Sequence, residues 1–174
     1  SIAETPIPAG WDLISSSCTG PNTPASITPD AGEVITCTFT NEEDANIIVI
    51  KQTDPDGDPT SFEFNPSYAS NFFLSDGQSN DSGDLAPGTY SVSEIVPAGW
   101  DLTSATCTDG TPASISLQAG ETVTCTFNNQ KDAFIIVDKV TDPAGDPTLF
   151  DFTTDYGSPF SLADATTPNN SGDL

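Results

Sequence analysis

The amino-acid sequence predicts an all-β protein built from tandem β-sandwich units. Short runs in which apolar and polar residues alternate recur along the chain, and no segment shows convincing helical periodicity. Fifteen prolines and thirteen glycines separate these runs and mark turns. The sequence also repeats itself with a period of about 88 residues, so that one small domain is the repeating unit of a tandem array.

The repeat is carried by four pairs of segments. "PAGWDL" stands at 8–13 and at 97–102, "AGEVITCTFTN" at 31–41 matches "AGETVTCTFNN" at 119–129, "IIVIKQTDPDGDPTSFEF" at 47–64 matches "IIVDKVTDPAGDPTLFDF" at 135–152, and "NDSGDL" at 80–85 matches "NNSGDL" at 169–174. The pairs predict one complete unit at 45–130, the C-terminal half of a preceding unit at 1–44 and the N-terminal half of a following unit at 131–174.

A half-unit cannot bury a core alone. We therefore expect the half-units to be completed by adjacent repeat units of the same chain or by head-to-tail copies, a contact that generates open filaments. Ser1 is not an initiator methionine, which indicates a processed chain or a window from a longer one.

Seven β-strands are predicted in the complete unit. They lie near 46–52, 61–65, 71–74, 89–95, 100–106, 113–117 and 122–128, where patterned runs are bounded by Gly, Pro, Asp and Asn. This number of short strands is typical of a β-sandwich of immunoglobulin-like size.

The charge of the chain excludes several classes of partner. Twenty-six acidic residues stand against three lysines, for a formal net charge of −23. Such a chain cannot neutralise the phosphates of a nucleic acid or dock on anionic lipid. No apolar run is long enough for a transmembrane helix, and we expect no signal peptide in this segment. Four cysteines, with no histidine or methionine, fit an oxidising, extracellular setting.

Three predicted strands each place one polar residue on a face that is otherwise apolar. Side chains alternate between the two faces of a strand, which puts Lys51, Glu94 and Asn129 in phase with the core residues of their strands. The half-units repeat the pattern with Lys139, Glu4 and Asn41. Isolated buried charges are costly, so these three positions require an explanation.

Two interpretations account for the three polar residues. In the first, they lie at strand ends, where Lys51 extends its ammonium to solvent and Asn129 caps a turn. In the second, they form a covalent cross-link. Burial lowers the pKa of a lysine, and the neutral amine attacks the carboxamide carbon of the asparagine while a protonated glutamic acid polarises the carbonyl. Folding would supply the proximity that this reaction needs.

Four segments resemble the prealbumin-like domains of Gram-positive pilins and of collagen-adhesin B-type repeats. These segments are "IIVIKQTDPDG", "LAPGTYSVSE", "PAGWDL" and "VTCTFNN". The middle motif of that family, L-x-PGxYxxxE, is matched by Leu85, Pro87, Gly88, Tyr90 and Glu94.

The resemblance implies a role for each of the polar residues in phase with the core. Lys51 and Asn129 would be the bonded pair, and Glu94 the acid that assists the reaction. Glu4 would have the same assisting role in the first partial unit. Lys139 and Asn41 would be unpaired half-sites.

The cysteines predict disulfides. Four cysteines allow three pairings, and the repeat favours Cys18–Cys37 with Cys107–Cys125, since each unit then closes its own bond. Each such bond is expected to contribute about 3 kcal/mol to stability. A zinc site is disfavoured because the chain has no histidine and no CxxC spacing.

Two further features have competing interpretations. Asp54, Asp56 and Asp58 alternate around Gly57 as in a calcium loop, but Ala144 replaces Asp56 in the second copy and the bidentate glutamate is absent. We favour an acidic β-turn and no cofactor, with calcium as the alternative. Trp11 and Trp100 could be sugar-stacking platforms, but each shares a face with a leucine, which favours packed core residues.

These observations predict a structural protein. We expect a stalk segment of an extracellular fibre or surface adhesin, stabilised by intradomain Lys–Asn isopeptide bonds and disulfides. The alternative is a cell-surface binding module for a host protein or glycan. A turnover enzyme is poorly supported, since a Ser–His–acid set is impossible without histidine.

Overall fold

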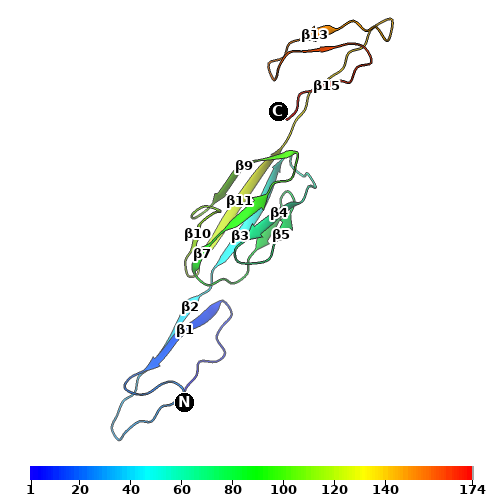
Figure 1. The fold of residues 1–174 in the computed structure, drawn as a ribbon. Helices are drawn as coiled ribbons and strands as arrows, with labels where there is room; N and C mark the ends of the chain where they lie inside the picture. Colours follow the sequence, from blue (N-terminus) through cyan, green and yellow to red (C-terminus); the bar gives the residue numbers. More distant parts are fainter. Residues whose placement is uncertain (174) are drawn as a thin grey trace. The chain divides into compact units, whose positions relative to one another are not determined.

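The computed structural model describes residues 1–173 of the chain, and these residues form β-strands without any helix (Figure 1). No helix in this range is long and apolar enough to cross a membrane. The strands are β1 (Trp11–Cys18), β2 (Cys37–Glu43), β3 (Asn46–Asp54), β4 (Phe62–Pro66), β5 (Phe72–Leu74), β6 (Ser79–Asp81), β7 (Gly88–Tyr90), β8 (Val92–Ile95), β9 (Trp100–Cys107), β10 (Ile115–Leu117), β11 (Thr122–Lys131), β12 (Ile136–Val137), β13 (Phe150–Phe152), β14 (Phe160–Leu162) and β15 (Asn169–Asn170). The predicted all-β class is therefore confirmed.

The described chain divides into two compact units. The first comprises Ser1–Val96 with Leu102–Asn129, and the second comprises Pro97–Asp101 with Gln130–Leu174. This spatial grouping does not follow the sequence repeat, so the repeat boundaries at 44/45 and 130/131 stay predictions. Leu174, the last residue of the predicted third segment, lies outside the described residues.

The complete repeat, most of which belongs to the first unit, is a sandwich of two main sheets. One has the strand order β6-β3-β11-β9, the other has the order β5-β4-β8, and β7 pairs with β10 in a separate short ladder. Alternate residues of β3, β4 and β11 are buried between the main sheets, as their period of two requires. Phe64 of β4 meets Phe127 of β11 edge to face, with ring centroids 5.1 Å apart. These rings join the two layers at the centre of the core.

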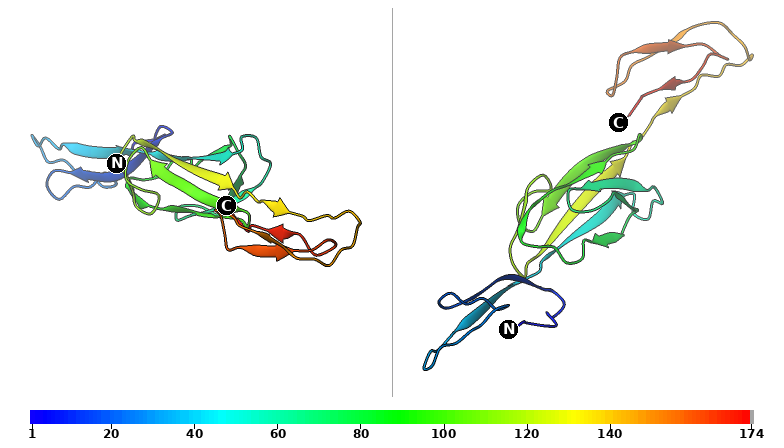
Figure 2. Two further views of the ribbon diagram at one scale, coloured as in Figure 1. Left: turned by 90° about the horizontal axis from the view of Figure 1, so that it is seen from above. Right: turned by 60° about the horizontal axis from the view of Figure 1, so that its bottom comes forward.

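The first and last strands of this sandwich lie side by side and run in the same direction. β3 and β11 are hydrogen-bonded neighbours, and Figures 1 and 2 show them together along the length of the sandwich. The amide of Asn46 donates to the carbonyl of Glu121 at one end, and Lys51 contacts Asn129 further along both strands. The chain therefore enters the sandwich at one end and leaves it at the other.

Two details of the strand pattern differ from the prediction. The single strand expected near 89–95 is split at Ser91 into β7 and β8, which belong to different sheets. At the break, Ser91 bonds a residue distant in the sequence: its amide donates to the Ser67 hydroxyl, and the Ser67 amide donates to the Ser91 carbonyl. β6 was not predicted, because its three polar residues pair with β3 through the backbone and carry no apolar signal.

The disulfides have the pairing that the sequence predicts. Cys18–Cys37 joins β1 to β2, and Cys107–Cys125 joins β9 to β11. No free cysteine is found among residues 1–173. Both bonds link strands that are adjacent in a sheet, and Cys107–Cys125 fixes the edge strand β9 against the inner strand β11.

The two tryptophans differ in burial, although their local sequences match. Trp100 is 7% exposed, whereas Trp11 is 41% exposed. The expectation of a packed tryptophan is therefore confirmed for Trp100 and wrong for Trp11. The matching sequences predict the strand face on which each ring lies. The burial of the ring depends on which other residues pack against that face.

We predict that Phe64→Ala destabilises the complete repeat by about 3–5 kcal/mol, because the ring is fully buried between the sheets and the change leaves a cavity. Phe73, one strand away and 60% exposed, is the matched control. Phe73→Ala is expected to change the unfolding free energy by less than about 1 kcal/mol. Urea titrations of both variants would measure the two losses, and equal losses would contradict the assigned core.

Candidate cross-linking site

Lys51 is held on the core face of β3 by strand alternation. Its residue exposure is 0%, the same as that of Ile47 and Val49 on the same face. The Nζ atom donates to Asn129 Oδ1 at 2.8 Å and to the Gln52 carbonyl at 2.7 Å. It also lies 4.0 Å from the ring centroid of Phe62 on the facing sheet. The amine is thus fixed in place and shielded from water.

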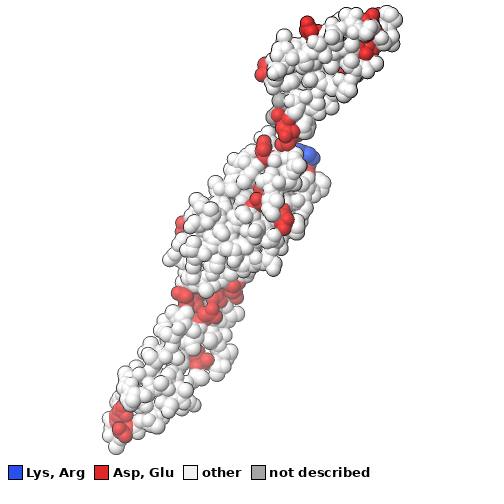
Figure 3. All heavy atoms as spheres, viewed as in Figure 1, with Lys and Arg blue, Asp and Glu red and all other residues white. Residues whose placement is uncertain are grey.

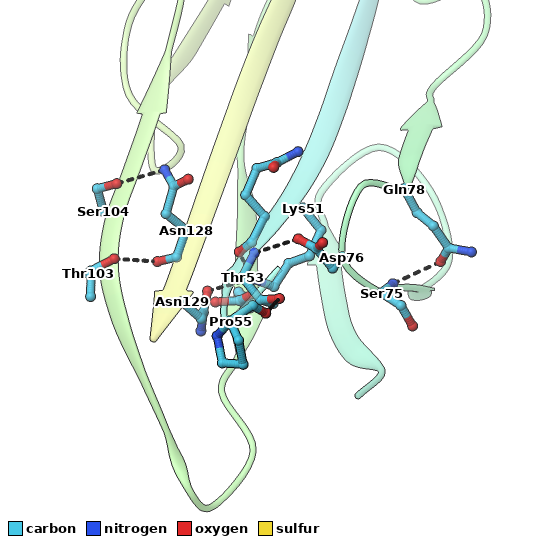
Figure 4. A network of polar contacts seen from close by, with 12 residues as sticks. Lys51, Thr53, Pro55, Ser75, Asp76, Gln78, Thr103, Ser104, Asn128 and Asn129 are labelled. Carbon is cyan, nitrogen blue, oxygen red and sulfur yellow. Dashed lines mark hydrogen bonds and ion pairs between the residues drawn. The ribbon is translucent and has the colours of Figure 1, made fainter. Parts of the chain in front are cut away.

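Asn129 occupies the equivalent position on the neighbouring strand. It continues the buried face of β11 and is 1% exposed. Figure 4 shows Lys51 and Asn129 pointing toward one another from β3 and β11. The buried Nδ2 atom of Asn129 has no hydrogen-bond partner among residues 1–173. An amide nitrogen without a partner in a dry site is poorly stabilised there.

Glu94 reaches the same point from β8 in the opposite sheet. Its side chain is fully buried, and Oε1 lies 3.6 Å from the Nζ atom of Lys51. Within the described chain neither carboxylate oxygen meets the geometry of a hydrogen bond. The three residues singled out by strand phase therefore converge on one buried site, and the interpretation in which Lys51 reaches solvent is wrong.

Burial shifts the pKa values of the acid and the base toward each other. Desolvation lowers the pKa of Lys51, and the nearby Glu94 carboxylate opposes that shift. Desolvation likewise raises the pKa of Glu94, and the Asn129 amide and the Lys51 charge oppose the increase. Both shifts favour the uncharged forms, because a low-dielectric interior penalises each charge. The site therefore increases the share of molecules with a neutral amine and a protonated acid.

The arrangement brings together the groups that amide transfer requires. A neutral lysine amine is a nucleophile, a carboxamide carbonyl is an electrophile, and a carboxylic acid can polarise that carbonyl and carry protons. Here the amine contacts the carboxamide oxygen, and the acid lies beside the amine. Fixed geometry of this kind replaces an encounter in solution.

Asp76 is a further residue of this region that the sequence interpretation missed. Its carboxylate accepts from the Thr53 amide at 2.6 Å and from the Gly57 amide at 2.7 Å, which anchors the turn after β3 (Figure 4). The hydrogen bond from Gly57 is the main reason that the pKa of Asp76 is lowered. In the second copy Asp164 accepts from Thr141 Oγ1 and from the Gly145 amide. The recurrence of this aspartate one repeat later, as Asp164, is the sequence signal that could have identified Asp76.

The segment with the alternating aspartates, Asp54 to Asp58, is held in its turn by the carboxylate of Asp76, which lies outside it. Asp54 and Asp56 are exposed, and Asp58 accepts from the amide and the hydroxyl of Thr60. Over residues 1–173, no group of three or more His, Cys, Asp or Glu residues is placed to hold a metal ion. The hydrogen bonds are those of a turn held by Asp76, and the alternative of calcium binding stays untested.

The half-sites are also formed in part. In the first unit the Asn41 amide donates to Glu4 Oε1 at 3.0 Å, and Glu4 Oε2 is buried without a described hydrogen-bond partner. In the second unit Lys139 Nζ donates to the Val140 carbonyl and lies 4.1 Å from the Phe150 ring centroid. Asn41 and Glu4 thus reproduce one part of the complete site, and Lys139 reproduces the other.

Acidic side chains dominate the charged surface. Several groups of them, and one small basic patch, are visible on the face drawn in Figure 3. Asp44 has a raised pKa, first through desolvation and then through Asp12, Asp84 and Glu42. Mutual repulsion of this kind is expected where acidic side chains cluster on a strongly acidic protein.

A shallow groove of about 460 Å³ lies beside the buried site. It is lined by Ser91, Val92, Ser93, Glu94, Leu102, Ala105, Pro112, Ala113 and Phe127. Phe127 is the only aromatic residue in this lining and is itself buried, and the chain has no arginine. Aromatic and arginine side chains dominate high-affinity protein interfaces, so the groove gives little support to the binding-module alternative.

For chains in which Lys51 is still a free amine, we predict that Glu94→Gln destabilises the fold by about 3 kcal/mol at neutral pH, since it leaves the buried ammonium without its counterion. Lys51 in the folded variant keeps a lowered pKa and binds fewer protons than in the unfolded chain. Stability should therefore rise with pH from the lowered pKa up to the ordinary lysine value of about 10.4. Urea titrations at several pH values in this range would measure the unfolding free energy of Glu94→Gln. Glu63→Gln, on the outer face of β4, is the control. In Glu94→Gln chains whose intact mass shows an unreacted Lys51, a stability independent of pH would contradict the buried pair.

Solved structures that resemble the chain include two bacterial proteins, both at low similarity. The major pilin protein of Streptococcus pyogenes is 19% identical with a TM-score of 0.41, over 54% of this chain and 48% of the pilin. The TIE protein of Bacillus anthracis is 20% identical with a TM-score of 0.43, over 81% of this chain and 29% of the other. The chain thus spans about half of the pilin and less than a third of the TIE protein. A search of curated proteins found no match.

The family assignment therefore relies on comparison with family models. Two models, each described as a prealbumin-like fold domain, match residues 47–131 and residues 6–43. Together they account for well over half of the chain, and the first covers the strands that supply Lys51, Glu94 and Asn129. The predicted resemblance is confirmed: the chain belongs to the prealbumin-like fold domains.

Proposed function

We propose that the chain is a structural segment of an extracellular fibre or surface stalk, in which an isopeptide bond joins Lys51 to Asn129. The observation that carries the proposal is the 2.8 Å contact between Lys51 Nζ and Asn129 Oδ1 in a fully buried site, with Glu94 3.6 Å from the same amine. The Asn129 carboxamide also acts on Glu94, where it opposes the rise in pKa, so the amine, the carboxamide and the acid adjoin one another.

The proposed reaction is a single amide transfer. The lone pair of neutral Lys51 Nζ forms a bond to Cγ of Asn129, while protonated Glu94 donates a hydrogen bond to the developing oxyanion. The Cγ–Nδ2 bond then breaks, and the proton lost by Nζ is carried by Glu94 to the departing nitrogen. The products are one secondary amide and one ammonia. No oxidant or cofactor is consumed, and each domain reacts once.

The position of the bond suits a load-bearing role. It would connect the first and last strands of the sandwich, which are parallel neighbours, across a sequence separation of 78 residues. Tension that enters through β3 would then leave through β11 along covalent bonds. The residues between the two strands would carry none of it, so the sandwich would resist unfolding under force.

The wider setting of the proposal rests on three observations. The chain consists largely of prealbumin-like domains, it has two disulfides, and it is strongly acidic. Disulfides persist in oxidising, extracellular environments, and a high net charge keeps a protein soluble. We therefore propose a location outside the cell, with neighbouring repeat units or further copies of the chain as partners.

Intact mass tests the bond directly. The folded wild-type chain should be lighter than its disulfide-bonded sequence by about 17 Da, one ammonia, for this Lys–Asn bond. Lys51→Ala and Asn129→Ala should each abolish the loss, and Lys131→Ala, which changes another lysine, should retain it. A wild-type mass explained by the disulfides alone would refute the proposed bond.

The rate of bond formation should depend on pH in a bell-shaped manner. The amine must be neutral, so the rate rises as pH passes the lowered pKa of Lys51. The acid must be protonated, so the rate falls as pH passes the raised pKa of Glu94. The apparent pKa values of the two limbs belong to the coupled pair.

Chain that has never folded, recovered from inclusion bodies, would be diluted from urea at several pH values. The loss of ammonia would then be followed by mass spectrometry. In Glu94→Gln the high-pH limb should disappear and the overall rate should fall by a factor of about 100 or more. A rate that rises with pH throughout in the wild type would exclude Glu94 as the assisting acid.

A further inference from the structure

We propose that Asp76 is a positioning residue for the reaction of Lys51. It acts through the peptide unit that joins Gln52 to Thr53, whose carbonyl accepts from the lysine amine and whose N–H donates to the Asp76 carboxylate. This inference rests on the proposed function, because it concerns the orientation of the same amine. It gives a role in the reaction to a residue that does not touch the reacting atoms.

A single peptide unit connects the carboxylate to the amine. Lys51 Nζ donates to the Gln52 carbonyl at 2.7 Å, and the Thr53 amide donates to Asp76 Oδ1 at 2.6 Å (Figure 4). This carbonyl and this N–H belong to the same planar peptide. A hydrogen bond to an ionised acceptor polarises the peptide and makes its carbonyl oxygen a stronger acceptor. Asp76 therefore strengthens the contact that holds the amine.

Asp76 is itself fixed in place and ionised. Its second oxygen accepts from the Gly57 amide at 2.7 Å, and this bond is the main reason that its pKa is lowered. The turn that carries Asp76 is attached to β3 by two backbone hydrogen bonds. The Lys51 amide donates to the Gln78 carbonyl, and the Gly77 amide donates to the Lys51 carbonyl. The backbone of the lysine and the carboxylate that orients its side chain thus belong to one hydrogen-bonded structure.

The second copy contains the same arrangement. Lys139 Nζ donates to the Val140 carbonyl. The amide and the hydroxyl of Thr141, the next residue, both donate to Asp164. Ala165 stands at the glycine position of the turn that carries Asp164 and has a positive φ of 62°. Because an alanine is strained in this region, the turn is retained despite a residue that disfavours it.

The Gln52 carbonyl determines the direction in which the lone pair of the amine points. Neutral Lys51 Nζ has two N–H bonds and one lone pair, and the lone pair must face Cγ of Asn129 for a bond to form. A carbonyl that holds one N–H against β3 leaves the lone pair for Asn129 and the second N–H for Glu94. The reaction needs this division, because the product amide keeps only one hydrogen on the nitrogen.

The atoms balance with this assignment. The hydrogen held by the Gln52 carbonyl stays on Nζ and becomes the N–H of the new amide. The other hydrogen of the amine is carried by Glu94 to Nδ2 of Asn129, which leaves with its own two hydrogens as ammonia. The Gln52 carbonyl is therefore hydrogen-bonded before and after the reaction, and Asp76 supports the contact in both states.

Nuclear magnetic resonance of the wild-type chain, with isotope labels in the lysine side chains and the glutamine carbonyls, tests the contact. The Nζ–H of the amide formed by Lys51 should show a coupling to the Gln52 carbonyl carbon across the hydrogen bond. Its resonance should also move upfield as pH falls through the pKa of Asp76, below the ordinary value of 3.8. This step is separate from the titration of Glu94, whose pKa is raised by burial.

The rate of ammonia loss in Asp76→Asn tests the role in the reaction, in chain that has never folded and is diluted from urea. Burial lowers the pKa of Lys51, and the charges of Glu94 and then of Asp76 oppose that shift. Removing the Asp76 charge alone would increase the share of neutral amine and accelerate the reaction. Loss of positioning should instead slow it about tenfold. Tryptophan fluorescence in the same samples should show that folding precedes the loss of ammonia.

Asp58→Asn is the matched control, since it removes a carboxylate from the segment after β3, where Asp58 accepts from the amide and the hydroxyl of Thr60. It should react at the wild-type rate. An Asp76→Asn chain that reacts as fast as the wild type, or an equal loss of rate in Asp58→Asn, would overturn the inference.

The wild-type spectra keep the inference testable even where Asp76→Asn does not fold. A cross-linked chain whose Nζ–H resonance lacks the coupling to Gln52, or does not respond to the titration of Asp76, would overturn the inference and leave the bond of Lys51 with Asn129 intact. A wild-type chain of unaltered mass would overturn the proposed function itself.

Discussion

The fold of the complete repeat depends on accommodating one buried lysine. An ammonium at 0% exposure is tolerated only if a counterion and acceptors surround it, or if it loses its charge. Glu94, Asn129 and the Gln52 carbonyl meet this need from the opposite sheet, the neighbouring strand and β3 itself. The two sheets are thus tied together by polar contacts at the point where the apolar core ends. The same burial that makes the lysine costly makes its amine nucleophilic.

The site could be located from the sequence because strand alternation is a local property. Knowing that "IIVIK" and "VTCTFNN" are strands is enough to place Lys51 and Asn129 on the core side, and the structure brings them into contact. The internal repeat strengthens the prediction of the site, because Lys51, Glu94 and Asn129 have identical counterparts in Lys139, Glu4 and Asn41.

Features that depend on distant backbone groups were not predictable in this way. Asp76 acts on amides that lie about twenty residues earlier in the chain, and nothing next to it in the sequence indicates this. β6 joins the sheet through backbone hydrogen bonds with polar side chains, and at the break between β7 and β8 Ser91 bonds a hydroxyl from another loop. Trp11 shows the same limit, because its exposure is decided by what packs against it.

The disulfide between β9 and β11 has a consequence for how such a domain would respond to its surroundings. β11 is the inner strand that lies between β3 and β9, and the disulfide fixes it to β9. With the proposed amide in place, β11 would be covalently attached on both flanks, by one link that thiols can cleave and one that they cannot. A reducing environment would then loosen the edge strand alone. The strand β9 would separate from the sheet more readily, whereas the resistance of the domain to tension between β3 and β11 would be unchanged.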